Sequence, residues 1–450
     1  MNDRSCLAVI LAAGLGTRMK SALPKVMHPI GGRPMLGHVM ATAQSAGCDR
    51  LAVVIGPETK SVEDLVSQTA PGAVCFTQVD RNGTAHAVLA ARPALEENVD
   101  DVIVLYGDTP LITADSIAKV RQAVADGADL AVLGFEAADP TGYGRLIVDG
   151  GRLVEIVEEN DATDTQRKVT FCNSGIIAFR GCLLPGLLDE IGNENAKGEY
   201  YLTDAVAIAA KRGLKVVAER GPQEDVLGVN NRVQLSQCEA IFQNRMRREA
   251  MLAGVTLVAP ETVFFSFDTK LENDVVVEPN VVFGPNVTVA TGSIIHAFSH
   301  LEGANVAANG KIGPYARLRP GASIGEGARI GNFVEVKKAT VEAGAKVNHL
   351  SYIGDARVGA KANVGAGTIT CNYDGYNKFH TDIGAGAFIG SNSALVAPVR
   401  IGDGALVAAG SVVVKDVPED ALVVARGQQV NKEGRAARLR AIKEKAKRKS

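Results

Sequence analysis

Hydrophobic residues recur at every sixth position towards the C-terminal end of the chain, at Ile383, Ile389, Leu395, Ile401, Val407 and Val413. An α-helix repeats about every 3.6 residues and a strand every two. A six-residue repeat of one aliphatic side chain is typical of a parallel β-helix, in which each hexapeptide forms one flat face and the aliphatic residue points into the prism. We therefore predict a β-helix with three faces to a coil.

The same ladder extends upstream, with some irregular steps. It runs through Val275, Val281, Val287, Ile294, Leu301, Val306, Ile312, Leu318, Ile324, Ile330, Val336, Val341, Val347, Ile353, Val358 and Val364. Its one large break lies between Ile369 and Ile383, where we expect a loop pushed out of the prism. Long loops in compact domains tend to be functional. A loose insertion is the less favoured alternative, because the loop carries Asn372, Tyr373, Asp374, Tyr376, Lys378 and His380.

The N-terminal half shows short apolar runs separated by helix-compatible segments. The runs occupy residues 6–13, 51–55, 73–78, 102–105 and 130–133. This alternation is typical of a doubly wound α/β sheet, whose ligands collect at the carboxyl ends of the strands. Apolar residues three or four apart predict an amphipathic helix over residues 234–253, ended by Gly254.

A glycine-containing turn, GLGTRM at residues 14–19, directly follows the first run. Such a turn lets backbone N–H groups cradle phosphates, and a helix beginning nearby would add its positive end. The turn matches neither the Walker A nor the dinucleotide fingerprint. Arg18 and Lys25 put two cations near it, which would neutralise a triphosphate; taken alone, they could equally be ordinary surface cations. Asp108, after the fourth run, is either a Mg²⁺ ligand or the start of a turn, and the pattern does not decide between these.

Composition and charge narrow the classes of protein. A chain of 450 residues has room for two or three domains, and a net charge of -2 gives no general case for nucleic-acid binding. The last twenty residues hold nine Lys/Arg against two Glu, for which a solvated terminal helix is favoured over a nucleic-acid arm. Seven scattered cysteines, no signal sequence and no long apolar run lead us to expect a soluble, cytoplasmic protein without membrane insertion.

Several motifs together resemble known enzymes. LAAGLGTRM, LPK, the Gln78 and Gly83-Thr84 pair, Tyr106-Gly107-Asp108, GYGR, GEYYLTD and GVNNR are similar to the sugar-nucleotide pyrophosphorylase domain. With RLRPG, GNFVEVKKA, NHLSYIGD and GAGTITCNYDG on the predicted β-helix, nearly the whole chain resembles the bacterial bifunctional N-acetylglucosamine-1-phosphate uridylyltransferase/glucosamine-1-phosphate acetyltransferases. The resemblance implies a Rossmann-like nucleotidyltransferase domain (1–232), a linker helix (233–254), a left-handed parallel β-helix (255–426) and a basic tail (427–450).

In the first domain the resemblance implies uridylyl transfer from UTP to N-acetylglucosamine 1-phosphate. The nucleotide would lie on Leu11, Ala12, Ala13, Gly14, Lys25, Gln78, Gly83 and Thr84, with Arg18 and Lys25 on its phosphates. Asp108 and Asn230 would hold Mg²⁺. The sugar phosphate would contact Tyr106, Gly107, Gly144, Glu158, Asn173 and Asn230.

In the β-helix the resemblance implies acetyl transfer from acetyl-CoA to glucosamine 1-phosphate. Neutral imidazole suits proton removal from the amine near neutral pH, and His349 matches the general base; Glu335 would orient it or the amine. The sugar phosphate would contact Arg319, Lys337, Tyr352, Asn363 and Lys378, and acetyl-CoA would contact Ala366, Asn372, Tyr373, Ser391, Ala409 and Arg426. A homotrimer with sites between prisms is also implied.

Two other readings stay open at this point. The β-helix could be a structural or regulatory module on a monofunctional pyrophosphorylase, although a passive module has no need to assemble Arg319, Lys337, His349 and Tyr352. A non-catalytic regulatory subunit is the third reading, which the presence of Arg18, Lys25 and Asp108 disfavours.

Overall fold

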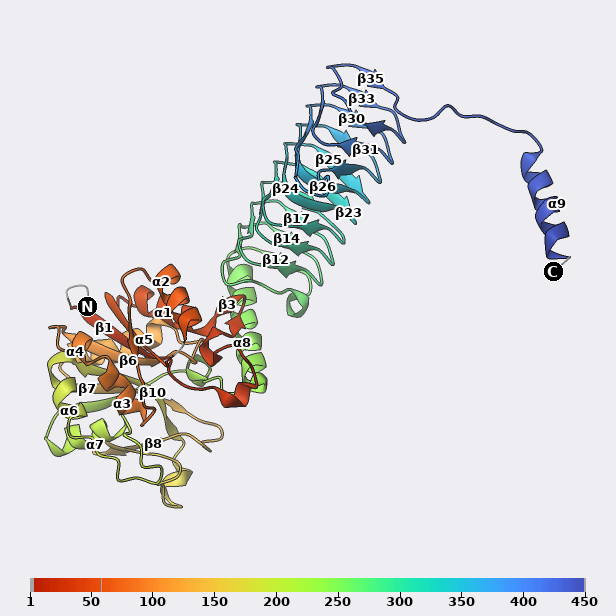
Figure 1. Cartoon of the computed structure of the whole chain (residues 1–450). Coiled ribbons are helices and arrows are strands. Elements are labelled where there is room, and N and C mark those ends of the chain that lie inside the picture. The colour runs from red at the N-terminus through yellow and green to blue at the C-terminus, as the bar shows by residue number, and fades with distance from the viewer. Residues whose placement is uncertain (1–3, 58, 449–450) are drawn as a thin grey trace. The chain divides into compact units, whose positions relative to one another are not determined.

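The structure, a computed structural model, describes residues 4–57 and 59–448 and divides into two compact units, Met1–Met246 and Arg247–Ser450 (Figure 1). Unit 1 is built on a nine-stranded mixed sheet. Its main path is β11 (Val216–Arg220), β7 (Leu130–Glu136), β10 (Phe171–Arg180), β6 (Asp101–Tyr106), β1 (Cys6–Leu11), β4 (Arg50–Ile55) and β5 (Val74–Thr77). β10 runs antiparallel to both neighbours, and β8 (Arg145–Asp149) and β9 (Arg152–Val157) form a hairpin beside it.

Helices cover both faces of this sheet, as predicted. Side chains alternate along β1, so that Cys6, Ala8 and Ile10 face one core while Leu7 and Val9 face the other. The first core is closed by α1 (Met35–Ser45), α2 (Lys60–Thr69) and α5 (Ala114–Ala125), and the second by α3 (Thr84–Ala90), α4 (Arg92–Leu95), α6 (Leu184–Leu188) and α7 (Asp204–Lys211). Burial on both faces explains why the runs are continuously apolar.

The glycine turn after β1 differs from the prediction in one respect. A 3-10 turn, η1 (Thr17–Met19), follows it, and it is flanked by left-handed residues Gly16 (φ 62°) and Lys20 (φ 49°). A second 3-10 turn, η2 (Lys25–Met27), and two short strands, β2 (Pro29–Ile30) and β3 (Arg33–Pro34), come next, and α1 begins only at Met35. The expectation of a helix start beside the loop was therefore wrong, because left-handed residues interrupt the segment before a helix can form.

The long helix α8 (Arg232–Leu252) confirms the predicted helix, although of its predicted apolar face only Cys238 is fully buried. Its Cys238 is buried, and the Phe242 ring packs edge-on against His38 at 5.5 Å between centroids. Gly254 ends the helix with φ 94° and donates its N–H to the Met251 carbonyl. The division between the two units falls within α8, after Met246. None of the helices formed by residues 4–57 and 59–448 is long and apolar enough to cross a membrane.

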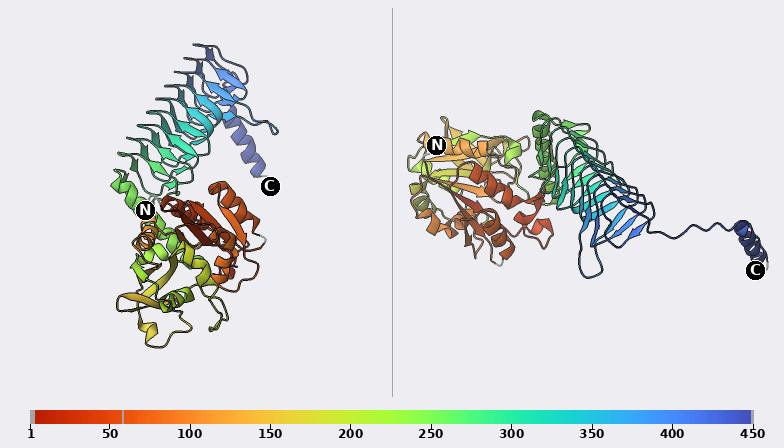
Figure 2. Two further views of the ribbon diagram at one scale, coloured as in Figure 1. Left: turned by 90° about the vertical axis from the view of Figure 1, so that its left-hand side faces the viewer. Right: turned by 90° about the horizontal axis from the view of Figure 1, so that it is seen from above.

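Unit 2 is a stack of three-sided β-coils (Figure 2). One face holds β12 (Thr256–Leu257), β14 (Val276–Val277), β17 (Ile294–Ile295), β20 (Lys311–Ile312), β23 (Arg329–Asn332), β25 (Lys346–His349), β27 (Asn363–Val364), β30 (Phe388–Ile389), β33 (Leu406–Val407) and β35 (Leu422–Val423). A second holds β15 (Val282–Phe283), β18 (His300–Leu301), β21 (Arg317–Leu318), β28 (Ile369–Cys371), β31 (Ala394–Val396) and β34 (Val412–Val413). The third holds β13 (Lys270–Leu271), β16 (Thr288–Val289), β19 (Ala304–Val306), β22 (Ala322–Ile324), β29 (Thr381–Ile383) and β32 (Val399–Ile401), and the longer β24 (Glu335–Val341) and β26 (Tyr352–Val358) turn the corner between the last two faces.

The spacing of paired residues confirms the predicted coil. Val276 pairs with Ile294 and Ile294 with Lys311, so one turn takes 17 or 18 residues, or three hexapeptides. The core ladder is buried from Ile312 to Val364 and again from Ile383 to Val413, as predicted.

In the upstream part of the ladder, the prediction chose the wrong residues for the strand positions. Val277, Phe283, Val289, Ile295 and Leu301 are the buried strand residues and step by six without irregularity. Val275, Val281 and Val287 are also buried, but they occupy the corner position two residues earlier. The predicted Ile294 is only half-buried. Ile369 is 47% exposed, and the buried Thr370 takes its place.

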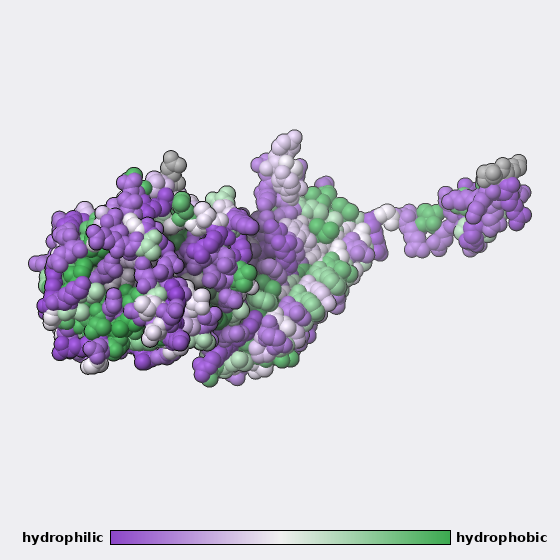
Figure 3. Space-filling model, turned by 90° about the horizontal axis from the view of Figure 1, so that it is seen from below, coloured by the Kyte–Doolittle hydropathy of each residue, from purple (hydrophilic) through white to green (hydrophobic). Residues whose placement is uncertain are grey.

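The predicted loop leaves the stack at residues 372–380 and carries Tyr376 at 91% exposure (Figure 2). Its base is fixed, because the buried Asn372 donates from Nδ2 to Asp355 at 2.5 Å. Beyond the last coil, the basic tail forms α9 (Arg435–Lys447), all of whose residues are exposed. Its surface is mainly hydrophilic, whereas the coils show patches of hydrophobic surface (Figure 3).

Candidate functional sites

The predicted nucleotide residues gather in unit 1 at the carboxyl ends of β1, β5 and β6. Leu11, Ala12, Ala13, Gly14, Gln78, Gly83 and Thr84 line one cavity of about 220 Å³ together with Lys25, Tyr106 and Asp108. The start of the loop after β1 is anchored to the residue after β6, since Gly107 donates its N–H to the Leu11 carbonyl at 2.9 Å. The fold thus brings together residues that lie almost a hundred positions apart.

The turn at Gly83 is clamped by the segment GEYYLTD. Gly83 has φ 116°, and a Cβ there would lie 2.4 Å from the Tyr200 carbonyl oxygen, so only glycine fits. Tyr200 accepts the Ala85 N–H at 2.9 Å and donates to Asn82 at 2.8 Å. Gln78, buried beside this turn, donates to the Gly83 carbonyl at 3.3 Å. A rigid edge of the cavity results, at which backbone and amide groups can recognise a planar ring.

Two cations and two side-chain oxygens meet around Lys25, which lines the cavity together with Asp108; Arg18 and Asn230 are not among its lining residues. The Lys25 ammonium contacts both the Asp108 carboxylate and the Asn230 side-chain oxygen, the latter at 2.9 Å. Arg18 also donates to that oxygen, at 2.9 Å. Because one cationic nitrogen touches both oxygens, they lie close enough to share a divalent cation, and one carboxylate with added phosphate and water ligands suits Mg²⁺. The predicted pair Asp108 and Asn230 therefore fits the ion.

A second cavity of about 420 Å³ contains most of the predicted sugar contacts. Gly144, Glu158 and Asn173 line it, and Tyr106 and Thr84 line both cavities. Burial raises the pKa of Glu158, although the hydroxyl of Thr203 donates to it at 3.1 Å. Burial likewise raises the pKa of Tyr106, so its hydroxyl stays protonated. Of the other two predicted contacts, Gly107 supports the loop after β1 and Asn230 lies with the two cations.

The predicted acetyl site lies along one corner and face of the β-helix. His349 ends β25, and Asn332, its ladder partner one coil earlier, accepts from its Nδ1 at 2.8 Å. An amide oxygen can only accept, so Nδ1 carries the hydrogen and Nε2 is left as a base. His349 is exposed, which leaves that nitrogen accessible.

Glu335 has a different partner from the one expected. It accepts from Arg319 at 2.8 Å and lies 3.7 Å from Arg317. Its side chain therefore holds Arg319, and the residue that bonds to His349 is Asn332. The alternative, that Glu335 orients the amine, stays a prediction. Asn332 was not predicted from the sequence, although it lies one coil period, 17 residues, before His349.

Cations and polar groups surround this corner. The pKa of Lys337 is lowered by its contact with Lys378, because two positive charges lie side by side. A bound anion would relieve the repulsion between these two lysines. Tyr352 pairs in the ladder with Glu335, and its hydroxyl lies 3.5 Å from the Asn372 amide. Asn363 lies in the next coil, paired with Lys346. The exposed Tyr373 lies on the projecting loop, where its backbone forms an isolated antiparallel β-bridge with Lys378.

The predicted coenzyme A contacts fall on successive coils. Ala366 accepts the N–H of Asn392, and Ser391 accepts that of Gly410 at 2.8 Å. Arg426 donates to the Ala409 carbonyl at 2.6 Å. The structure thus links Ala409 with Arg426 and places Ala366 and Ser391 on the coils before them.

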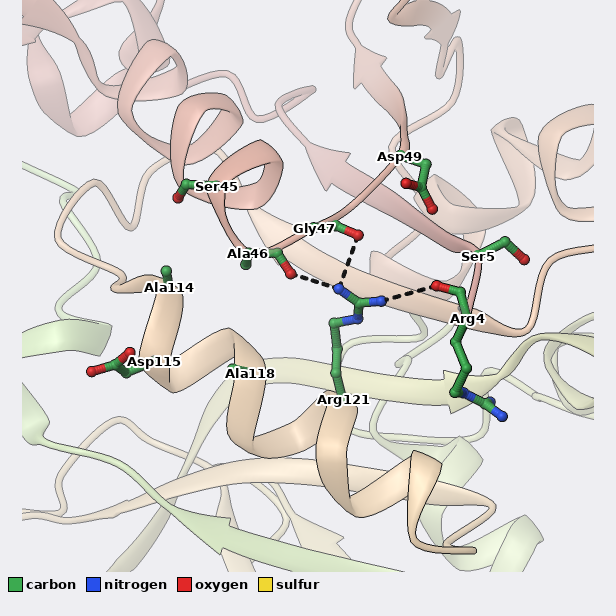
Figure 4. Close-up of a pocket in the computed structure, with 10 residues that line it drawn as sticks. All are labelled: Arg4, Ser5, Ser45, Ala46, Gly47, Asp49, Ala114, Asp115, Ala118 and Arg121. Carbon is green, nitrogen blue, oxygen red and sulfur yellow. Dashed lines mark hydrogen bonds between the residues drawn. The ribbon is translucent and has the colours of Figure 1, made fainter. Parts of the chain in front are cut away.

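A further hollow of unit 1, about 600 Å³, contains none of these residues (Figure 4). At its centre the buried Arg121 donates to the Ala46, Gly47 and Arg4 carbonyls. These bonds cap the end of α1 and tie it to the start of β1. The hollow has a structural explanation, and we assign it no chemistry.

Comparison with known proteins agrees with this division. Residues 8–170 match the MobA-like NTP transferase domain, and residues 268–303 and 380–415 match the bacterial transferase hexapeptide (six repeats). The chain is 61% identical to the "Bifunctional protein GlmU" of Azorhizobium caulinodans over 99% of its length and all of that protein. It is 58% identical to the Xanthobacter autotrophicus protein of the same name over 99% of the chain and all of that protein, and 56% identical to the Agrobacterium fabrum one over 97% of each. Since similarity of this degree spans both units, the chain belongs to the GlmU family of bifunctional enzymes.

Proposed function

We propose that unit 1 carries out uridylyl transfer and unit 2 carries out acetyl transfer, so that one chain performs two consecutive steps of UDP-N-acetylglucosamine synthesis. The enzyme acetylates glucosamine 1-phosphate with acetyl-CoA, and then joins the product to the uridylyl group of UTP with release of pyrophosphate. The single observation that best supports two active sites is the presence of a complete polar constellation in each unit: Lys25, Asp108 and Asn230 in the first, and Asn332, His349 and Arg319 in the second.

In the uridylyl site the sugar phosphate attacks the α-phosphorus of UTP in line, so positioning and charge neutralisation carry the reaction. Backbone N–H groups of the residues 11–14 loop hold the phosphates, and the turn Gly83-Thr84 with Gln78 holds the base. Arg18 and Lys25 neutralise charge as it moves to the leaving pyrophosphate. Asp108 and Asn230 would hold Mg²⁺, which supplies further neutralisation of the phosphate oxygens when bound. Tyr106, Glu158 and Asn173 orient the sugar.

In the acetyl site His349 Nε2 removes the proton from the amine as it attacks the thioester carbonyl. Asn332 keeps the imidazole in the tautomer that presents Nε2. Arg319, Lys337 and Lys378 hold the sugar phosphate, with Tyr352 and Asn363 beside them. Acetyl-CoA lies along the coils of Ala366, Ser391, Ala409 and Arg426, while Asn372 and Tyr373 frame it from the projecting loop.

The proposal includes a homotrimer. Phe298, Tyr315 and Phe333 form a column at one corner of the coils, with ring centroids 4.9 and 5.2 Å apart. All three are about half exposed and adopt the left-handed conformation, which is unusual for aromatic residues. An exposed apolar column of this kind suits burial against a second copy of the chain. The column ends one coil before Leu350, beside His349, where a partner could complete the acetyl site.

The function is tested with two assays on the purified protein. One supplies acetyl-CoA and glucosamine 1-phosphate, and follows free coenzyme A; the other supplies UTP and N-acetylglucosamine 1-phosphate, and follows pyrophosphate with and without a chelator. We expect both products, with only pyrophosphate release lost on removal of Mg²⁺. Pyrophosphate release without acetylation would make the β-helix a structural module.

We also propose that the protein is cytoplasmic, which is consistent with its seven free cysteines, and that it has no nucleic-acid partner and is not inserted in a membrane.

A further inference from the structure

One cation that lines the nucleotide cavity has no place in the scheme above. Arg81 lies between Gln78 and Gly83, the two residues proposed to hold the base, and it lines the cavity with Lys25. Its side chain turns back across the sheet edge, where Nε donates to the Ala13 carbonyl at 2.8 Å. Arg81 thereby joins the base-binding turn to the phosphate-binding loop.

The Ala13 carbonyl is a sensitive point of that loop. The earlier part of the loop is fixed by backbone bonds, from Gly107 to Leu11 and from Ala12 to Val54. The next residue, Gly14, is exposed, and a Cβ added to it would meet no atom within 4 Å. The bond from Arg81 is therefore a restraint at the point where the backbone of the loop becomes exposed.

The geometry of the peptide unit passes this restraint on to a phosphate ligand. The peptide between Ala13 and Gly14 is trans, since the cis bonds of the described chain are Gly313-Pro314 and Ala397-Pro398. In a trans peptide the carbonyl and the following N–H point in opposite directions. A guanidinium that fixes the Ala13 carbonyl consequently also fixes the direction of the Gly14 N–H, one of the donors proposed to hold the phosphates.

Gly56, the residue after β4, makes room for this arrangement. A Cβ there would lie 2.6 Å from Arg81 Nη2 and 3.5 Å from the Ala13 oxygen. The first distance is too short for a real contact, so any larger residue would displace the guanidinium. Because the displaced atom is at the far end of a flexible side chain, the fold itself would be little disturbed.

We infer that Arg81 is a positioning residue for uridylyl transfer, which locks the Ala13–Gly14 peptide so that the loop is ready for the phosphates of UTP. The inference rests on the proposed nucleotide site. A planar guanidinium presents several donors in a fixed fork, whereas lysine offers a point charge on a flexible stem. The role therefore depends on shape as well as on charge.

The test measures steady-state kinetics of pyrophosphate release with the full-length protein. In Arg81→Ala we expect KM for UTP to rise about tenfold, the effect of losing one hydrogen bond from a charged group, with kcat changed by less than about threefold. KM for N-acetylglucosamine 1-phosphate and the rate of acetyl transfer should remain unchanged. Arg81→Lys should not restore the affinity for UTP. Gly56→Ala should also raise KM for UTP, without lowering the unfolding temperature by more than a few degrees.

Controls separate this inference from the proposed site. Arg92→Ala removes another arginine of unit 1, a half-buried one paired with Asp189, and should behave as wild type. Lys25→Ala tests the nucleotide site itself: if KM for UTP is unchanged there, the proposed site is wrong. If Lys25→Ala weakens UTP binding but Arg81→Ala does not, the site stands and the role of Arg81 is refuted. Full recovery in Arg81→Lys would also refute it, because charge alone would then explain the effect.

Discussion

Replacing Asn332 by alanine tests how the proposed base of acetyl transfer is oriented. The change removes the acceptor of the 2.8 Å bond to His349 Nδ1 and leaves the ring free to rotate and to exchange tautomers. It should not affect the cations that hold the sugar phosphate. We therefore expect kcat for acetyl transfer to fall while KM for glucosamine 1-phosphate changes little.

The size of the effect follows from the environment of the bond. Asn332 is half-buried and His349 exposed, so the bond should contribute about 0.5–1.5 kcal/mol net. At about 1.4 kcal/mol for each factor of ten, kcat should fall about two- to tenfold. Asn332→Asp should act differently: a carboxylate stabilises the protonated imidazole, so the rise of activity with pH should move to higher pH.

The assay follows coenzyme A release with a thiol reagent over a range of pH. Asn305→Ala is a matched control, because it removes an amide that bonds to Thr288 on an earlier coil and should leave both activities intact. Uridylyl transfer by the same preparations reports on folding of unit 1. If Asn332→Ala has wild-type kcat and Asn332→Asp an unshifted pH profile, Asn332 does not orient the base.

Three further predictions concern unit 1. Gly83→Ala should abolish most uridylyl transfer while sparing acetyl transfer, because its Cβ would press on the Tyr200 backbone; a normal rate would contradict the clamp. Burial raises the pKa of Glu158, so its ionisation costs stability, and the contribution of Glu158 to the unfolding free energy should fall as pH rises above the ordinary pKa of a glutamate, about 4. Glu158→Gln should lack that part of the pH dependence in chemical denaturation, and an identical pH dependence would show that Glu158 contributes none. Chelation of Mg²⁺ should stop pyrophosphate release and leave coenzyme A release unchanged, whereas loss of both would place a metal requirement in unit 2.

The regular features of the fold were visible in the sequence, because each has a period. Continuous apolar runs predicted the central strands, and the six-residue step predicted the coils. The prediction failed at Val275, Val281 and Val287, since a coil has two buried positions in each hexapeptide and both can be aliphatic. In the coils before Ile312 the buried strand residues begin with Val277 and Phe283. Because the corner residues are aliphatic too, a six-residue spacing alone does not show which of the two positions lies on a strand.

Of the candidate sites, the sequence predicted the residues that belong to recognisable motifs, but not their contacts. Lys25, Asp108 and Asn230 were expected near one another, and the fold brings them into contact. The partners of side chains were not predictable, because they depend on which coil or loop lies alongside. Glu335 binds Arg319 instead of orienting His349, and Arg81 reaches a carbonyl 68 positions away. Contacts of this kind follow from three-dimensional packing and leave no local pattern.

The most direct test of two separate active sites is a crossed assay of two variants. Wild type, Asp108→Ala and His349→Ala are each measured for pyrophosphate release and for coenzyme A release under identical conditions. Our account predicts that Asp108→Ala loses only the first activity and His349→Ala only the second. Loss of both activities in either variant, or loss of the opposite one, would contradict the assignment of one reaction to each unit.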